Sequence, residues 1–103
     1  MYYRTAYVLL VFVITEPHFC DLKQKFYKVV HLDPVCRHLI NDDDGRKMEQ
    51  IRRNNNDLEG MRTEMLIAFL NEIPNPTWRN VVEALRAANY ECLADKIEHD
   101  MQG

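Results

Sequence analysis

The stretch PTWRNVVEALR, residues 76–86, decides which fold the sequence predicts. Thr77 is a preferred residue type for the N-cap of a helix, because its hydroxyl can accept a hydrogen bond from a free backbone N–H. Trp78, Val81, Val82 and Leu85 then follow at spacings of three and four residues, which places them on one helical face. A helix with such an apolar stripe has to bury it against other elements.

The residues before this stretch predict a second and longer helix that it can pack against. Asn56 or Asp57 can cap that helix. The inward positions at helical spacing are Leu58, Met61, Met65, Leu66, Phe69 and Leu70. Two prolines within residues 73–76 cannot continue it. We therefore expect the longest helix of the chain to end near Ile73.

Four shorter amphipathic helices are expected on either side of this pair. The first has Leu22, Phe26 and either Val29 or Val30 on its apolar face. The second begins with Asp33 as N-cap and Pro34 as first residue, and its apolar side consists of Val35, Leu39 and Ile40. The third follows the polar break 41–45, turns Met48 and Ile51 inward and ends at residues 54–56, and the last carries Leu93, Ala94, Ile97 and Met101.

The sequence thus predicts an all-α, six-helix antiparallel bundle over residues 17–103, with no sheet between residues 17 and 101. A chain of 103 residues fits one domain. It has only 3 Gly and 4 Pro, too few for the many tight turns that a β-sandwich or barrel needs. Each helix is too short to be stable alone in water. We expect one shared core that contains Ile51, Leu66, Phe69, Trp78, Val82 and Leu85.

An apolar lead segment, residues 1–16, precedes the predicted bundle. Its run Ala6–Ile14 would cover about 14 Å as a helix, against a hydrocarbon core of about 30 Å, so it cannot span a membrane. The run could instead be a signal peptide, but no small-x-small cleavage site follows it. The third interpretation is a buried strand or extra helical turn, or a sequence boundary whose partner is missing; its β-branched residues favour an extended conformation.

Composition narrows the function classes and the compartment. The formal charge of -3, from 13 Lys and Arg against 16 Asp and Glu, provides no basic field for nucleic-acid binding. Three widely spaced cysteines, Cys20, Cys36 and Cys92, form no CxxC pair and suggest reduced thiols rather than a disulfide framework. A cytoplasmic protein is the resulting expectation.

Four motifs in order resemble the death-domain branch of the death-fold superfamily. They are MEQIRRN at 48–54, RTEML at 62–66 continuing to Leu70, PTWRNVVEALR at 76–86 and LADKI at 93–97. The resemblance covers about residues 22–101, and Pro34 and Cys36-Arg37 stand where the family often has a tryptophan and a Leu-Gly pair. It implies a non-catalytic adaptor without a cofactor, which assembles with other death-fold domains in apoptotic or innate-immune signalling.

Residues with possible chemistry do not form a convincing active site or metal site. Aligning Gly45 with the sixth position of an EF-hand loop places Ile40 and Ile51 where ligands belong. His18, Cys20, His31, Cys36 and His38 lack the usual zinc-ligand spacing. Cys36 and His38 are two residues apart on a predicted helix, so they face away from each other and cannot act as nucleophile and base. We predict neither an enzyme nor a metal site.

The distribution of surface charge suggests where a protein partner would bind. Arg46, Lys47 and Arg52 form a basic edge, whereas Arg53 can pair with Glu49 four residues earlier and is less available. We expect this edge to meet acidic residues of another copy or of a partner, with Glu59 and Glu64 first and Glu98 next. Such head-to-tail contacts can propagate into rings or filaments.

Two functions stay open on the sequence alone. The favoured one is a homotypic interaction module of an adaptor or receptor. The alternative is a structural or autoregulatory death-fold domain of a larger protein, which folds alike but makes no homotypic assembly.

Overall fold

The computed structural model describes residues 13–102, with side chains described through residue 100. These residues form a short 3-10 turn, η1 (Glu16–His18), and six α-helices: α2 (Phe19–Lys25), α3 (Leu32–Leu39), α4 (Arg46–Asn54), α5 (Leu58–Glu72), α6 (Trp78–Ala87) and α7 (Glu91–Gln102). Within this range the only β pairing is an isolated antiparallel bridge between Val13 and Thr77. The prediction of an all-α bundle of six helices is confirmed.

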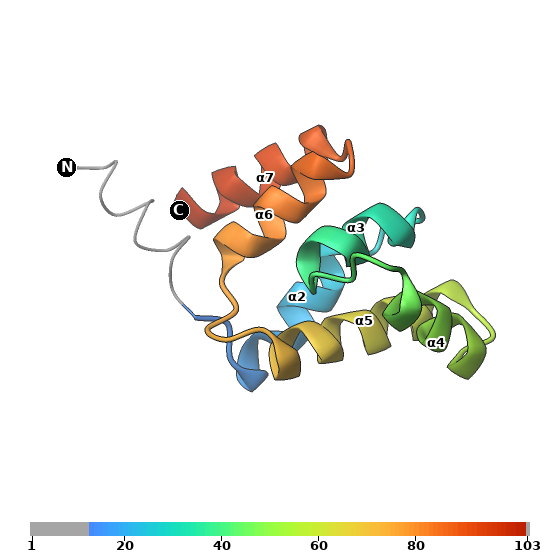
Figure 1. Cartoon of the computed structure of the whole chain (residues 1–103). Coiled ribbons are helices and arrows are strands. Elements are labelled where there is room, and N and C mark those ends of the chain that lie inside the picture. The colour runs from blue at the N-terminus through green and yellow to red at the C-terminus, as the bar shows by residue number, and fades with distance from the viewer. Residues whose placement is uncertain (1–12, 103) are drawn as a thin grey trace.

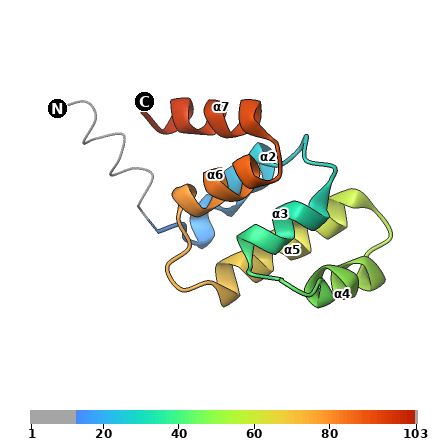
Figure 2. The ribbon, with the colours of Figure 1, turned by 45° about the horizontal axis from the view of Figure 1, so that its top comes forward.

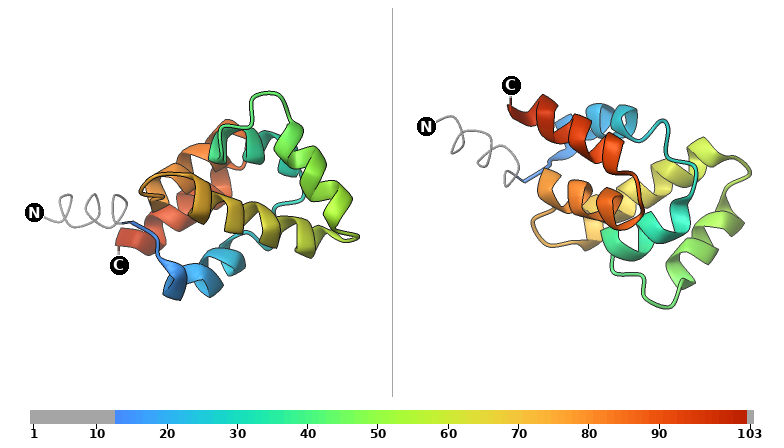
Figure 3. Two further views of the ribbon diagram at one scale, coloured as in Figure 1. Left: turned by 60° about the horizontal axis from the view of Figure 1, so that its bottom comes forward. Right: turned by 90° about the horizontal axis from the view of Figure 1, so that it is seen from above.

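The helices pack as a bundle in which neighbours along the chain are often neighbours in space (Figure 1). Helix α3 packs on α6, α6 on α7, and α4 and α2 both on α5. In Figure 2, α4 lies at the end of the bundle away from α7. Figure 3 shows α2 alongside α5. Among the described residues, no helix has both the length and the apolar character needed to cross a membrane.

Helix α6 begins as its sequence predicts, with Thr77 as the N-cap. The Thr77 hydroxyl accepts a hydrogen bond from the Asn80 N–H at 3.2 Å, and the Asn80 side-chain oxygen accepts one from the Thr77 N–H at 2.9 Å. These reciprocal bonds satisfy N–H groups that the first helical turn leaves unpaired. They fix the start of the helix so that Trp78 points into the core.

The core has the composition expected from the helical spacing. Buried side chains come from every α-helix and include Leu22, Val35, Ile51, Leu66, Phe69, Trp78, Val82, Leu85 and Ile97. The prediction that six named residues from three helices share one core is confirmed. The structure also decides between two valines that the spacing left open: Val29 is buried, whereas Val30 is 52% exposed. The inward position expected of Met101 falls outside the described side chains.

Helices α4 and α5 begin at capping carboxylates. Asp57 is the N-cap of α5 and accepts a hydrogen bond from the Gly60 N–H at 2.8 Å, while α5 is the longest of the described helices and stops before Ile73. Asp42, four residues before the first residue of α4, caps that helix. Its carboxylate accepts hydrogen bonds from the N–H groups of Lys47 and Met48, each at 3.0 Å. The polar break at 41–45 therefore caps the third predicted helix, as expected.

The start of one predicted helix and the end of another were wrong. Helix α3 begins at Leu32, with His31 rather than Asp33 as N-cap, so Pro34 lies inside the first turn, where its missing N–H is still without cost. Burial of Leu32 and hydrogen bonds from the Val30 and His31 N–H groups to the Tyr90 hydroxyl hold the chain in this position. Helix α2 ends at Lys25, so Val29 reaches the core from a turn rather than from the helix.

The end of the apolar lead segment takes part in the bundle. Ile14 is 3% exposed and belongs to the core cluster. Its N–H donates a hydrogen bond to the Pro76 carbonyl at 2.6 Å, beside the bridge between Val13 and Thr77. The rest of the run, residues 6–12, lies outside the described residues, so the interpretations of that part stay predictions.

Candidate interaction surface

The three cations predicted to be available on the third helix all have partners within the chain. Lys47 pairs with Glu72 of α5 at 2.7 Å, Arg52 pairs with Asp33 of α3, and Arg46 pairs with Asp44 at 3.1 Å. Arg53 also has a partner, so the presence of an ion pair does not distinguish these three cations from Arg53, contrary to the expectation that they are freer. For Lys47 and Arg52 the reason is tertiary: α4 packs on α5 and α3, which brings carboxylates from distant parts of the sequence to its basic side. The partner of Arg46 is local, because Asp44 lies two residues before it.

The pKa values of two of these cations reflect their partners. Hydrogen bonding to Glu72 raises the pKa of Lys47, and hydrogen bonding to Asp33 raises the pKa of Arg52. The pair between Glu49 and Arg53, expected from their spacing, is present. Helix α4 thus presents cations that already share their charge with neighbouring acids, and a protein partner would have to compete for them.

Two of the predicted acidic residues lie together on α5. Glu59 and Glu64 line one hollow at the start of this helix, together with Asp57 and the half-exposed side chain of Ile67. The Glu64 carboxylate accepts hydrogen bonds from the side-chain amides of Asn54 and Asn55, at 3.2 and 2.8 Å. Glu59 is exposed and has no ion pair within the described part of the chain. It is the most available anion of the hollow.

Glu98 lies elsewhere and is occupied. Arg86 of α6 donates to the Glu98 carboxylate at 2.6 Å and also pairs with Asp95 at 2.8 Å, so it bridges two acids of α7. These hydrogen bonds raise the pKa of Arg86. The structure does not bring Glu98 together with Glu59 and Glu64, which line a hollow on α5.

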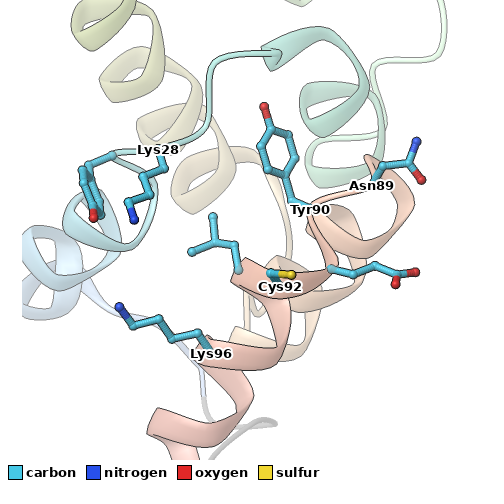
Figure 4. A pocket seen from close by; sticks show the side chains of 8 residues that line it. Lys28, Asn89, Tyr90, Cys92 and Lys96 are labelled. Atoms are coloured by element: carbon cyan, nitrogen blue, oxygen red, sulfur yellow. The ribbon is translucent and has the colours of Figure 1, made fainter.

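A cleft between the end of α2 and the start of α7 carries cations that no sequence pattern singled out. Its lining includes Tyr27, Lys28, Tyr90, Leu93 and Lys96, and Figure 4 shows Lys28 coming from the turn after α2 and Lys96 from α7. Both lysines are exposed, and neither forms an ion pair within residues 13–100. This cleft therefore holds available positive charge beside apolar and aromatic surface.

Tyr27 is the most prominent side chain of this region. It is 59% exposed, the largest exposed fraction among the large apolar and aromatic side chains that the structure describes, and the Lys28 ammonium lies 5.3 Å from the centre of its ring. Exposed tyrosines are enriched among residues that dominate protein interfaces. The sequence signal was an aromatic residue outside the apolar stripe of the predicted first helix, next to the inward-facing Phe26.

The basic cleft and the acidic hollow belong to one surface. A third hollow between α2 and α5 is lined by Tyr27 and Glu59, so it adjoins the cleft on one side and the acidic hollow on the other. Arg62 in this hollow is occupied, because its Nε donates to the Val29 carbonyl at 2.6 Å. Both signs of charge occur along it: Glu91 lines the cleft with Lys28 and Lys96, Lys23 lines the third hollow with Glu59, and the hollow on α5 is lined by carboxylates.

Cys36, one of the residues weighed as a nucleophile, has a structural role. Its side chain is buried, and its thiol donates to the Asp42 carboxylate at 3.7 Å. Burial, followed by the nearby charge of Asp42, raises the pKa of Cys36 to about 12. A thiol with this pKa is protonated at neutral pH and is a poor nucleophile. Within the described residues, no group of three or more His, Cys, Asp or Glu is placed to hold a metal ion.

This arrangement predicts that the three thiols react differently. In the folded protein at about pH 8, a thiol reagent should modify Cys20 and Cys92, which are exposed, and leave Cys36 unmodified. All three should react after unfolding in denaturant. Mass spectrometry of the labelled protein counts and locates the adducts. Rapid labelling of Cys36 in the native protein would contradict its buried, protonated state.

Comparison with protein families, with curated proteins and with solved structures finds no match to this chain.

Proposed function

We propose that the chain is a non-catalytic protein-protein interaction module of the death-domain type, which recruits other death-fold domains in apoptotic or innate-immune signalling. The observation that carries the proposal is the surface around Tyr27, where an exposed aromatic side chain lies beside the available lysines of the cleft and the available carboxylate of Glu59. A central aromatic residue contributes affinity, and the flanking charges contribute orientation and association rate.

The death-domain part of the proposal is supported by where the motif residues lie. Ile51, Leu66, Trp78, Leu85 and Ile97 come from the four motifs that resemble the family, and all five are buried in one core. The motifs therefore lie in the helices whose packing they would specify in a domain of this type. Six helices alone do not define a function, so the proposal depends on the surface as well.

The alternative is a structural or autoregulatory death-fold domain of a larger protein. The internal pairing of Arg46, Lys47, Arg52 and Glu98 favours this second candidate for the surface of α4 and α7, because those charges already stabilise the bundle itself. The two candidates differ in whether the chain binds another death-fold domain.

The test is direct binding of the purified chain to a panel of purified death domains, caspase-recruitment domains and death-effector domains. We expect at least one domain to bind with an association rate that falls as ionic strength rises, because opposite charges steer encounter and are screened over about 8 Å at physiological ionic strength. An unrelated helical bundle of similar charge serves as the negative control.

Two charge reversals compare the candidate basic surfaces. Lys28→Glu reverses an unpaired cation and should slow association with the partner, while the thermal midpoint stays nearly unchanged. Arg52→Glu places a carboxylate beside Asp33 and should lower the midpoint, by an amount set by an exposed pair worth about 0–1 kcal/mol. If no death-fold domain binds and the wild-type chain stays monomeric at high concentration and low ionic strength, the autoregulatory candidate replaces the adaptor.

A further inference from the structure

Helix α5 carries an apolar side chain on its outward side. Gly60, Thr63, Ile67 and Leu70 follow one another at spacings of three and four residues, so they form one stripe along the helix. Ile67 is 44% exposed, although the outward side of a surface helix is normally polar. In the left view of Figure 3, α5 runs across the front of the bundle, and no described helix crosses over it.

Two hollows meet at Ile67 and together form a groove along α5. The first is the acidic hollow at the start of the helix, and the second lies beside η1 and the end of the lead segment. Their lining along α5 extends from Gly60 to Asn71, which is roughly 16 Å at 1.5 Å per residue. We call the two hollows together the α5 groove, and its characteristic residues are Glu16, Phe19, Glu59, Glu64, Ile67 and Leu70.

The charges of the α5 groove have one sign. Within the described part of the chain, every charged residue that lines either hollow is acidic: Glu16, Asp57, Glu59 and Glu64. Glu16 and Glu59 are exposed and form no ion pair among these residues. Cations begin only beyond Glu59, where Lys23 and Arg62 line the neighbouring hollow. The groove therefore has apolar surface around Ile67 and available negative charge at both ends.

We propose that the α5 groove binds a basic amphipathic helix of about three turns, supplied by another protein. Three turns of helix have the length of the groove, and an amphipathic helix in an apolar groove is a common mode of peptide recognition. Apolar residues of the partner at spacings of three and four would cover Ile67 and Leu70. Lysine or arginine at its two ends would then meet Glu16 and Glu59.

Charge argues for this occupant above the others. Nucleic acids and anionic lipids carry negative charge, and the acidic ends of the groove would repel them. The apolar run Ala6–Ile14 of the chain itself contains no charged residue, so it would leave Glu16 and Glu59 unpaired. The inference goes beyond the proposed function, because the partner is a short helical segment rather than a folded death-fold domain.

The experiment measures binding of a fluorescently labelled synthetic peptide to the purified full chain by fluorescence anisotropy. The peptide has about 14 residues, with leucine at helical spacings of three and four and lysine at the other positions. We expect saturable binding to one site that weakens as ionic strength rises, together with a gain of peptide helicity in circular dichroism. A control peptide of the same composition, with its leucines moved so that no stripe forms, should bind much more weakly.

The apolar part of the groove is tested by Ile67→Ala. This variant should raise the dissociation constant of the striped peptide by about tenfold, as for a central contact residue. Val30→Ala is the matched control, because Val30 is also an exposed aliphatic side chain, at 52%, and lines neither hollow. It should leave binding unchanged.

The acidic ends are tested by the double variant Glu16→Lys with Glu59→Lys. It should raise the dissociation constant by about tenfold or more, since like charges would then face the peptide. Asp43→Lys with Glu83→Lys changes the net charge equally at exposed residues that line neither hollow, and it should have a much smaller effect. Thermal midpoints near that of the wild type establish that every variant is folded.

Several results would overturn the proposal. A striped peptide that does not bind means that the groove is closed to a helix, whatever covers it. Equal losses in the two double variants would indicate general attraction of a basic peptide to an acidic chain, and equal binding of both peptides would exclude recognition of a helical stripe. Unchanged binding by Ile67→Ala would place the peptide elsewhere.

These outcomes can be distinguished from failure of the proposed function. Tyr27, Lys28 and Lys96 line neither hollow of the α5 groove, and only Glu59 borders both surfaces. Binding of a death-fold domain is measured separately and should not change in Ile67→Ala. A chain that binds such a domain but not the striped peptide would keep the interaction module and reject only this groove.

Discussion

Trp78→Ala should leave the protein largely unfolded at physiological temperature. Trp78 is 7% exposed, belongs to the shared core and is the first residue of α6. Replacing a core tryptophan by alanine typically costs about 3–5 kcal/mol, from lost apolar burial and from the cavity left behind. Small domains have only about 5–15 kcal/mol of stability in total, so a large share of it would be lost. Circular dichroism during thermal unfolding measures the effect.

The matched control is Tyr27→Ala, which truncates an aromatic side chain that is 59% exposed. This variant should keep the helical signal and shift the thermal midpoint of the monomer only slightly, since little buried surface is removed. A Trp78→Ala protein with an unchanged midpoint would mean that Trp78 is not a core residue, and the packing of α6 would then be wrong.

Ile14→Ala should destabilise the protein strongly, although Ile14 precedes all of the described helices. The side chain is 3% exposed within the core cluster, and the loss of a buried isoleucine to alanine costs about 2–5 kcal/mol. Truncation removes the side chain but leaves the hydrogen bond from the Ile14 N–H to the Pro76 carbonyl in place. Urea unfolding of the variant and the wild type measures the difference in the free energy of unfolding.

Val13→Ala is the neighbouring control. Val13 is 44% exposed, so its truncation should cost much less than that of Ile14. Equal losses at both positions would mean that the lead segment is held by its backbone alone. No loss at Ile14 would mean that the bundle begins after it, near the boundary at residue 16 that the sequence suggested.

The internal ion pairs change what the surface of this bundle can do. Pairing within the chain occupies the cations of α4, and Arg86 of α6 is occupied by two acids of α7. Lys28, Lys96 and Glu59 have no ion pair within the described residues, and they line hollows that Tyr27 also lines. This is why the proposed function uses the surface around Tyr27 rather than the basic edge that the sequence favoured.

A helix boundary could be predicted when the hydrogen bonds that set it join residues close together in the sequence. Thr77 and Asp57 cap the helices that they immediately precede, and their bonds to residues three positions later are visible in the sequence. The start of α3 was misplaced because Tyr90, about sixty residues away, accepts the hydrogen bonds of the preceding segment. No local pattern contains that contact.

The sequence by itself determined the class of fold and most of its core. Apolar residues at spacings of three and four place Ile51, Leu66 and Trp78 on inward helical faces, and this periodicity is a property of the helix, whatever packs against it. Tertiary structure decided which long-range ion pairs form. The Lys47–Glu72 and Arg52–Asp33 pairs join residues 25 and 19 positions apart, whereas the Glu49–Arg53 pair follows from helical spacing. Pairing between helices depends on how they pack against each other, which the periodicity of a single helix does not encode.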